Sequence, residues 1–387
     1  MFLTKQQNHT LMRIAVNTRL LLKGRLDGIG WFTFETLRRI VTAHPEHEFL
    51  FLFDRKPSEE FIFADNVRPV VLFPPTRHPV LWHLFFEFSV PLALRRYKAD
   101  MLLSPDGWIP LNCNVPTLNV IHDLNFEHCH DFMQRSHQRY FKYFFPKFAR
   151  NATRLATVSE FSRKDIVNTY RIPQDKIDVV YDGYNELYHT YPDTVKTEIR
   201  NRYTDGYPFF ISVGTILKRK NLDTLFAAFD IFKETDTSGT KLLVVGNRKW
   251  WKGDIENAYL AMRNKNDVVF AGRVEAEVLG KMVSAATALA YVSYFEGFGI
   301  PIIEAFSAGT AVITANTTSM PEVAGDAALL VDPYSPTDIA EALNIMATNS
   351  ELRNALVQKG LQQMKHFGWD KTARLLWQSL TKIIPQE

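Results

Sequence analysis

The chain of 387 residues contains only two cysteines, Cys113 and Cys129, too few for a disulfide framework. It has no low-complexity run and no uncharged run of about 18 apolar residues, so we expect no transmembrane helix. The net charge of +3 is too small to predict nucleic-acid binding. The first residues also lack an apolar core long enough for a signal peptide. Together these absences favour a cytoplasmic protein with reduced thiols.

One short segment contains several residues of the types that bind metals, and their spacing can be compared with that of known zinc sites. His122, Asp123, His128, Cys129 and His130 lie close together in the sequence. No second pair of Cys or His residues follows at zinc-finger spacing, however. We therefore expect no structural metal at this group.

The length is too great for one hydrophobic core, and we expect two domains of about 190 residues each. Apolar segments in the first half predict strands at 12–16, 48–53, 67–73, 99–104, 115–123, 156–159 and 177–185. Apolar segments in the second half predict strands at 208–214, 241–246, 268–274 and 288–293. Amphipathic segments separate these strands, so the sequence predicts parallel sheets covered by helices on both faces.

The most informative stretch begins EGFGIPIIEAF at Glu296. Gly297-Phe298-Gly299 predicts a turn, and the proline two residues later predicts the first turn of a helix that contains Glu304. Free N–H groups near Gly299 and Ile300 would then suit an anion such as a diphosphate. The residues alone predict an anion-binding helix start with two acids nearby. A pair of surface carboxylates on an ordinary strand-to-helix turn is the alternative.

This stretch resembles the E-x7-E motif of the retaining, glycogen-synthase-like glycosyltransferases of family 4, and AGTAVIT and SMPEVAGDAALLVDP follow it in order. The resemblance implies an α/β fold of the GT-B type, with two Rossmann-like doubly wound parallel-sheet domains that face a cleft. It implies an acceptor-side domain of residues 1–190 plus 369–387, the latter a returning C-terminal helix. Residues 191–368 would form the domain that binds the nucleotide sugar.

Arg219 and Lys220 follow the predicted strand at 208–214. Two basic residues in a loop are usually solvated. The family, however, has a similar R-K-N segment after V-G-T as a donor-phosphate signature, which implies that these cations neutralise the leaving diphosphate. Many members carry an arginine where Thr215 stands here, so the charge would fall on Arg219 and Lys220 alone.

The resemblance also implies roles for the two acids. Glu296 would bind a sugar hydroxyl and orient the ring, and Glu304 would accept hydrogen bonds from the ribose hydroxyls. The backbone near Arg273 and Val274 would face the nucleobase. The remaining substrate-binding residues of the second domain would be Gly214, Gly297, Phe298, Gly299 and Ile300.

Two features of the first half complete the predicted site. Gly28-Ile29-Gly30 lies between a strand and an amphipathic helix, a context that suits phosphate approach, although a tight turn explains the glycines equally well. His122 ends a predicted strand, and the ligand crevice of a parallel sheet lies at such strand ends. The alternative is a histidine whose ring nitrogens only form hydrogen bonds with neighbouring residues. The resemblance implies that Gly28 and Gly30 close over the donor diphosphate and that His122 lies near the reacting sugar.

Two segments rich in aromatic and basic residues each allow two interpretations. Residues 79–97 are either a core helix broken at Pro91 with a solvated basic end, or a surface for an acceptor or a membrane headgroup layer. Residues 132–154 are either a helix that packs Phe141, Phe144 and Phe145 inward, or a basic face for an anionic lipid carrier. We favour the core interpretation of both, which leaves peripheral membrane contact open.

The combined prediction is a retaining glycosyltransferase that uses no metal and no cofactor. Its donor would be a nucleotide-diphosphate sugar, with GDP-mannose favoured because the segments are similar to the mannosyltransferase branch and a UDP-sugar as the alternative. The acceptor would be a hydroxyl of a glycan or lipid-linked glycan in cell-surface polysaccharide synthesis. Competing classes are a nucleotide-sugar epimerase, a phosphorylase, which would need a pyridoxal lysine site that we do not find, and a non-catalytic nucleotide-sugar-binding protein. The oligomeric state stays open.

Overall fold

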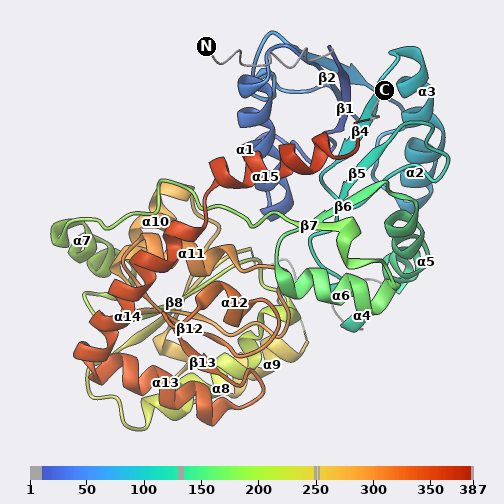
Figure 1. Ribbon diagram of the computed structural model, residues 1–387. Helices are drawn as coiled ribbons and strands as arrows, with labels where there is room; N and C mark the ends of the chain where they lie inside the picture. Colours follow the sequence, from blue (N-terminus) through green and yellow to red (C-terminus); the bar gives the residue numbers. More distant parts are fainter. Residues whose placement is uncertain (1–10, 130–134, 248–250, 252, 385–387) are drawn as a thin grey trace.

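The computed structural model describes residues 11–129, 135–247, 251 and 253–384, which form two parallel β-sheets covered by helices (Figure 1). The seven-stranded sheet has the order β3-β2-β1-β4-β5-β6-β7, and the six-stranded sheet has the order β10-β9-β8-β11-β12-β13. Each registered pair of neighbouring strands is parallel, as crossover helices require. The predicted α/β fold with two doubly wound Rossmann-like domains is confirmed.

The strands are short and mostly buried, which explains why they read as nearly continuous apolar runs. The first sheet contains β1 (Arg13–Asn17), β2 (Glu48–Phe53), β3 (Val67–Val71), β4 (Met101–Ser104), β5 (Thr117–Val120), β6 (Arg154–Thr157) and β7 (Ile177–Val179). The second contains β8 (Phe209–Val213), β9 (Lys241–Val245), β10 (Val268–Gly272), β11 (Ala288–Tyr291), β12 (Ala311–Ala315) and β13 (Leu329–Val331). The strand predicted at 177–185 is wrong beyond Val179, because the chain leaves the sheet there toward the second domain.

The first domain has six α-helices and one π-helical turn among its described residues. They are α1 (Gly28–Ala43), α2 (Pro79–Leu84), the π-turn η2 (Phe85–Ser89), α3 (Val90–Arg96), α4 (Asn125–His128), α5 (Arg135–Asn151) and α6 (Glu160–Tyr170). The predicted break at Pro91 is wrong, because α3 continues the helical run through it. Proline crowds the carbonyl of the preceding turn, and the wider π-turn ahead of Pro91 relieves that conflict.

The inward-packing interpretation of α5 is confirmed. Phe145 is buried, and Phe141 and Phe144 pack against the same core. Residues 132–134 of that predicted segment lie outside the described residues.

The second half contributes the remaining helices. They are α7 (Asp193–Thr204), α8 (Leu222–Lys233), α9 (Asp254–Ala261), α10 (Ala276–Ala285), α11 (Ile300–Ser307), α12 (Met320–Ala324), α13 (Pro336–Thr348), α14 (Ser350–Gln363) and α15 (Trp369–Thr381). Within the described part of the chain, no helix combines the length and the apolar character needed to cross a bilayer.

Helix α15 follows the second domain in sequence but lies against α1 of the first (Figure 1). Asp370 pairs with Arg39 of α1 at 2.5 Å, and the Thr372 hydroxyl donates to the Tyr181 carbonyl at 2.5 Å. A Cβ on Gly183 would lie 2.4 Å from the backbone nitrogen of the first α15 residue, so this crossing requires glycine. The two segments that connect the domains are therefore packed side by side.

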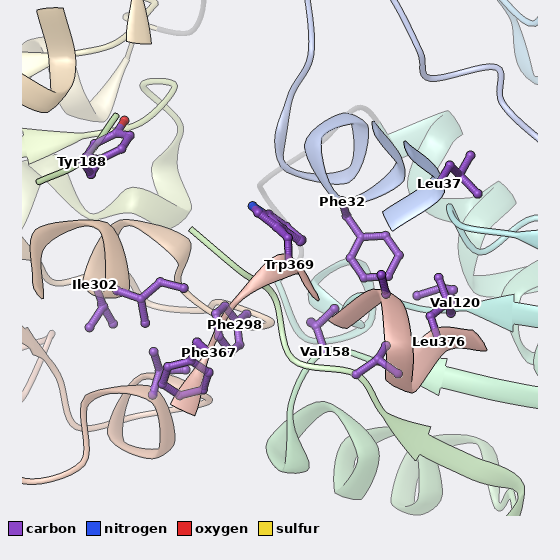
Figure 2. Packing of buried hydrophobic residues seen from close by; sticks show 14 of the residues in the cluster. Phe32, Leu37, Val120, Val158, Tyr188, Phe298, Ile302, Phe367, Trp369 and Leu376 are labelled. Carbon is purple, nitrogen blue, oxygen red and sulfur yellow. The ribbon is translucent and has the colours of Figure 1, made fainter. Parts of the chain in front are cut away.

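One hydrophobic cluster extends through this crossing and joins the domains (Figure 2). It contains Phe32 of α1, Leu376 of α15, and Phe298 from the loop before α11. The ring of Phe298 lies 5.4 Å from that of Phe367 and 6.2 Å from that of Tyr181. The loop that carries the predicted site is thus anchored in the core between the two domains.

Candidate functional site

Glu296 lies between two cations at the carboxyl edge of the second sheet. It follows β11, whereas Arg219 and Lys220 belong to a 3₁₀ turn (Lys218–Lys220) that follows β8. Strands β8 and β11 are neighbours, so the loops after them meet. Arg219 Nη1 lies 2.6 Å from Glu296 Oε2, and Lys220 Nζ lies 2.7 Å from Glu296 Oε1. The structure therefore brings these three predicted catalytic residues together.

Taken by themselves, these three side chains carry one positive charge in excess, and the half-buried carboxyl of Asp123, whose pKa burial raises, also acts on Arg219 and Lys220. Burial favours a raised pKa for Glu296, but the charges of Arg219 and Lys220 outweigh burial and lower the pKa to about 2. Burial lowers the pKa of Lys220 to about 8, although the attraction of Glu296 opposes it. Burial also disfavours the charged form of Arg219, yet the negative charge of Glu296 keeps the pKa of Arg219 above its usual value. Two cations and one carboxylate at neutral pH form a site that suits an anion.

The position of Lys220 depends on two of its neighbours. Its Nζ donates to the Tyr291 hydroxyl at 2.6 Å and lies 4.5 Å from the centre of that ring. Gly214 has a φ of +139°, and a Cβ there would come within 3.2 Å of Lys220 Cε. Asn221, the last residue of R-K-N, donates to the carbonyls of Val292 and Pro333 at 2.8 and 2.7 Å. We did not foresee this structural role of the asparagine.

The Gly297 loop touches the first domain directly. A Cβ on Gly297 would lie 2.5 Å from the His122 carbonyl oxygen and 2.8 Å from Asp123 Cβ. The Gly297 carbonyl accepts hydrogen bonds from the hydroxyls of Ser159 and Ser162 at 2.6 and 3.1 Å. Only glycine allows this approach, which holds the site loop against the carboxyl edge of the first sheet.

Helix α12 makes a second bridge between the domains. Glu322 Oε1 accepts from the Glu160 N–H at 2.8 Å, and Oε2 accepts from the Phe161 N–H at 3.0 Å. A carboxylate at this helix start satisfies donors that have no partner inside the helix. Ser319, just before α12, donates to the carbonyls of Glu296 and Phe298 at 2.9 Å each. Glu322 was not among the predicted site residues, since only the fold reveals that it reaches α6.

His122 lies beside the Gly297 loop in a half-buried position. Its Nε2 lies 2.8 Å from the Pro105 carbonyl, and its ring meets Phe32 edge-on at 4.9 Å. Burial lowers the pKa of His122, which favours the neutral ring near pH 7. A neutral His122 donates through Nε2 to that carbonyl, so Nδ1 is the acceptor.

The neighbouring His and Cys residues have other partners. His128 Nε2 lies 2.8 Å from Asp165 Oδ1, and its ring stacks on Phe295 of the second domain at 5.6 Å. Burial raises the pKa of the Cys129 thiol to about 11, and His130 lies outside the described residues. Where side chains are described, no three His, Cys, Asp or Glu residues gather as a set of metal ligands.

Gly28 and Gly30 lie inside the first turn of α1, which corrects the predicted loop ahead of the helix. Asp27 is the N-cap, and its carboxylate accepts from the Gly30 N–H at 2.9 Å. The helix start thus takes the place of a glycine loop at this edge of the first sheet.

Arg273 connects the second domain to the segment that precedes α1. Its Nη2 donates to the Gly24 carbonyl at 3.1 Å, so the side chain spans the two domains. Val274 is partly buried and packs against the shared core.

The start of α11 contains the remaining predicted residues. Gly299 has a φ of +109° and is the N-cap, and Ile300 is the first helical residue. Glu304 is half-buried, and burial raises its pKa to about 8 against the effect of a hydrogen bond from Tyr188. Phe298 is 3% exposed and its ring belongs to the core, so its side chain is not available to a ligand.

Residues 195–363 match a family model described as Glycosyl transferases group 1, and residues 26–186 match one described as Glycosyltransferase Family 4. The chain is 28% identical over 364 residues to O-antigen chain mannosyltransferase B of Escherichia coli, covering 90% of this chain and 94% of that protein. It is 25% identical over 257 residues to O-antigen chain mannosyltransferase RfbU of Salmonella typhimurium, covering 66% and 67%. The fold is similar to that of sucrose-phosphate synthase from Thermosynechococcus elongatus, with a TM-score of 0.78, 17% identity, and coverage of 96% and 98%.

Proposed function

Since this chain belongs to the family 4 and group 1 glycosyltransferases, we propose that it transfers mannose from GDP-mannose to a hydroxyl group with retention of configuration. The acceptor is a glycan or lipid-linked glycan in cell-surface polysaccharide synthesis. The support for mannose is the relative from Escherichia coli, a mannosyltransferase that matches along nearly its whole length. A UDP-sugar is the alternative donor.

The observation that carries the chemistry is the pair of cations, Arg219 and Lys220, held on either side of Glu296. Breaking the bond between sugar and phosphate builds negative charge on the leaving diphosphate. Arg219, Lys220 and the N–H groups at the start of α11 would stabilise that charge, and fixed charges and dipoles of this kind commonly supply the largest catalytic effect. Glu296 holds both cations in place before the donor binds. We propose that this arrangement replaces a divalent metal.

Glu296 is also the residue suited to the sugar. With a pKa of about 2 it stays ionised, so it accepts a hydrogen bond from a sugar hydroxyl and orients the ring. Glu304 accepts from the ribose hydroxyls, and that donation favours its ionised form although its pKa in the free protein is about 8.

The acceptor enters from the first domain, near the neutral ring of His122. Its hydroxyl attacks the face that the diphosphate leaves, and the departing phosphate oxygen takes the hydroxyl proton. The close contacts of Gly297 with His122 and Asp123 support this proposal, because they bring the proposed acceptor side and the proposed donor loop together.

Nucleotide-sugar binding and product analysis test the proposal. We expect GDP and GDP-mannose to raise the melting temperature more than UDP and UDP-glucose, since a ligand that binds the folded state stabilises it. With a mannoside acceptor, the chain should release GDP and form an α-linkage from the α-linked donor. Conversion of donor without acceptor would indicate an epimerase. Tight binding without nucleotide release, tested over a panel of acceptors, would indicate a non-catalytic protein.

A further inference from the structure

A buried ion pair, Arg19 with Asp106, lies at the carboxyl edge of the first sheet. Arg19 follows β1 and Asp106 follows β4, and these two strands are neighbours. Arg19 Nε lies 2.5 Å from Asp106 Oδ2, and the two side chains are 9 and 3% exposed. The loops after the two strands therefore bring a cation and an acid together on the side of the sheet where ligands bind.

The carboxylate of Asp106 is held in place by further hydrogen bonds. Its Oδ1 accepts from the Asn17 side-chain amide at 2.7 Å and from the Trp108 N–H at 3.3 Å. The amide oxygen of the same asparagine accepts from the Arg19 backbone N–H at 3.4 Å. Asp106 is therefore a fixed anchor for the guanidinium.

Two aromatic rings support this guanidinium. Its central carbon lies 5.0 Å from the centre of the Trp108 ring and 5.6 Å from that of Phe86. A cation at this distance from a ring face is attracted by the ring electrons. Both aromatic residues are buried, at 3 and 2% exposure, so they do not move aside easily. Asp106 and the two rings together fix the position of Arg19.

The remaining N–H groups of the guanidinium are unpaired among the described residues. Asp106 accepts from Nε, and no described residue accepts from Nη1 or Nη2. Unpaired donors on a largely buried charged group cost free energy. A guanidinium held by Nε alone presents its two other nitrogens as a fork, which suits two acceptor oxygens of a ligand.

This fork lies close to the proposed acceptor side of the site. Pro105 precedes Asp106 in the chain, and its carbonyl lies 2.8 Å from His122 Nε2. Burial lowers the pKa of His122, and the carboxylate of Asp106 is among the groups that oppose this shift. Arg19 is thus separated by a single ion-pair partner from the histidine near which we place the acceptor.

The charges around Arg19 favour a neutral ligand over an anionic one. Asp106 already balances the charge of Arg19. Burial and the charge of Glu87 raise the pKa of Tyr140, whereas Arg19 lowers it, so acid and cation act on the same phenol. Asp27 acts on His122 from the start of α1 and is a third acid near this edge. A phosphate would meet these negative charges, whereas the hydroxyl groups of a sugar offer acceptor oxygens without a charge.

We propose that Arg19 binds two adjacent hydroxyl groups of the acceptor sugar. Nη1 and Nη2 each donate to one hydroxyl oxygen, while Asp106 and Trp108 position the guanidinium. The inference rests on the proposed function, because an acceptor subsite presupposes that the chain transfers a sugar. It deepens that function, since it restricts the acceptor to a sugar with two free neighbouring hydroxyl groups beside the one that is glycosylated.

Binding of simple sugars tests this role without any transfer, so its failure is distinguishable from failure of the proposed activity. The probes are the methyl α-glycosides of mannose, glucose, galactose and N-acetylglucosamine. Tryptophan fluorescence reports their binding, because Trp108 lies under the guanidinium. We expect the wild type to bind at least one of them saturably. R19Q and R19K should bind it about tenfold more weakly or worse, because a hydrogen bond to a charged group contributes about this factor. R19K keeps the charge opposite Asp106 and should keep the melting temperature.

Monodeoxy analogues of the glycoside that binds separate recognition from a structural role. The wild type should bind about tenfold more weakly to each of the two analogues that lack one hydroxyl of the recognised pair. R19Q should bind these two analogues no more weakly than it binds the parent glycoside. If the two losses instead multiply in R19Q, Arg19 acts only through the structure and the proposal is overturned.

The matched control is R154K in the first domain, where the arginine pairs with both carboxylate oxygens of Asp178 at 2.5 and 2.7 Å. It also loses a guanidinium fork, yet it should bind the glycosides as the wild type does. The proposal is overturned if the wild type binds none of the four glycosides, or if R19Q and R19K bind them unchanged. It is also overturned if mannose 6-phosphate binds more tightly than methyl mannoside and depends on Arg19, which would identify an anion as the ligand.

Discussion

Glu322 and Glu160 belong to different domains, yet the Glu322 carboxylate accepts a hydrogen bond from the Glu160 backbone N–H at 2.8 Å. The other oxygen of the same carboxylate accepts from the Phe161 N–H. A side chain of the second domain thus accepts hydrogen bonds from the free N–H groups at the start of a helix in the first domain. Since Ser319 beside α12 also holds the carbonyls of Glu296 and Phe298, this contact couples domain closure to the shape of the site.

We therefore expect E322A to favour an open arrangement of the domains. Loss of a carboxylate that accepts two N–H groups should cost about 1–3 kcal/mol of closure free energy, because those donors lose a charged partner. Small-angle scattering with GDP bound should show a larger radius of gyration than the wild type, and donor KM should rise several-fold. E322Q keeps one acceptor oxygen and should lie between the two. The exposed Glu341 provides the control, since E341Q should scatter as the wild type does.

The cations beside Glu296 should be required for turnover. We expect K220A and R219A each to lower kcat by about 10²-fold or more, because each removes a positive charge that would stabilise the leaving diphosphate. The control is K218A in the same 3₁₀ turn, whose ammonium pairs with Asp254 at 2.8 Å on the surface. Steady-state rates of nucleotide release measure all three. Full activity in R219A and K220A would remove these residues from the mechanism.

The activity should depend on pH in a bell-shaped manner with a maximum close to pH 8. Burial raises the pKa of Glu304 to about 8, so the carboxylate that accepts ribose hydroxyls forms as the pH rises. Burial lowers the pKa of Lys220 to about 8, so its charge is lost as the pH rises further. The pH profile of kcat/KM reports these groups in the free enzyme. K220R should extend activity to higher pH, and an unchanged basic limb in that variant would contradict the assignment.

The raised pKa of Glu304 also has a consequence for stability. The folded state keeps a proton that the unfolded state has lost between about pH 4.5 and pH 8, so the free energy of unfolding falls as the pH rises through that window. Glutamine cannot ionise, so E304Q should melt above the wild type at pH 9 and close to it at pH 4.5. Differential scanning fluorimetry without ligand measures this difference. A difference that does not vary with pH would show that Glu304 is ionised in the free protein.

The sequence was sufficient for most of the fold, because buried parallel strands such as 48–53 read as apolar runs whatever their neighbours. The helix start at Gly28 was predicted too late in the sequence, because the two glycines were interpreted as a loop although Asp27 is a typical N-cap. The π-turn before Pro91 could not be predicted from the sequence, because Phe85 and Phe86 would be buried in an α-helical turn as well as in a π-helical one.

The candidate site was predictable only in part. The residue types were recognisable, but the contact of Glu296 with Arg219 and Lys220 depends on β8 and β11 being neighbours in the sheet. Sequence reasoning assigned the acid to the sugar and the cations to the diphosphate without foreseeing that they pair. Glu322 was hidden for a similar reason, since its partners are backbone groups of the other domain.

The most direct test of the central claim compares the affinities of GDP and GMP for the wild type and for K220A by isothermal titration calorimetry. If Lys220 binds the terminal phosphate of the leaving group, the wild type should prefer GDP strongly, and K220A should lose most of that preference while it binds GMP nearly as well as before. An equal preference for GDP in both proteins would contradict the claim that the cations beside Glu296 hold the diphosphate.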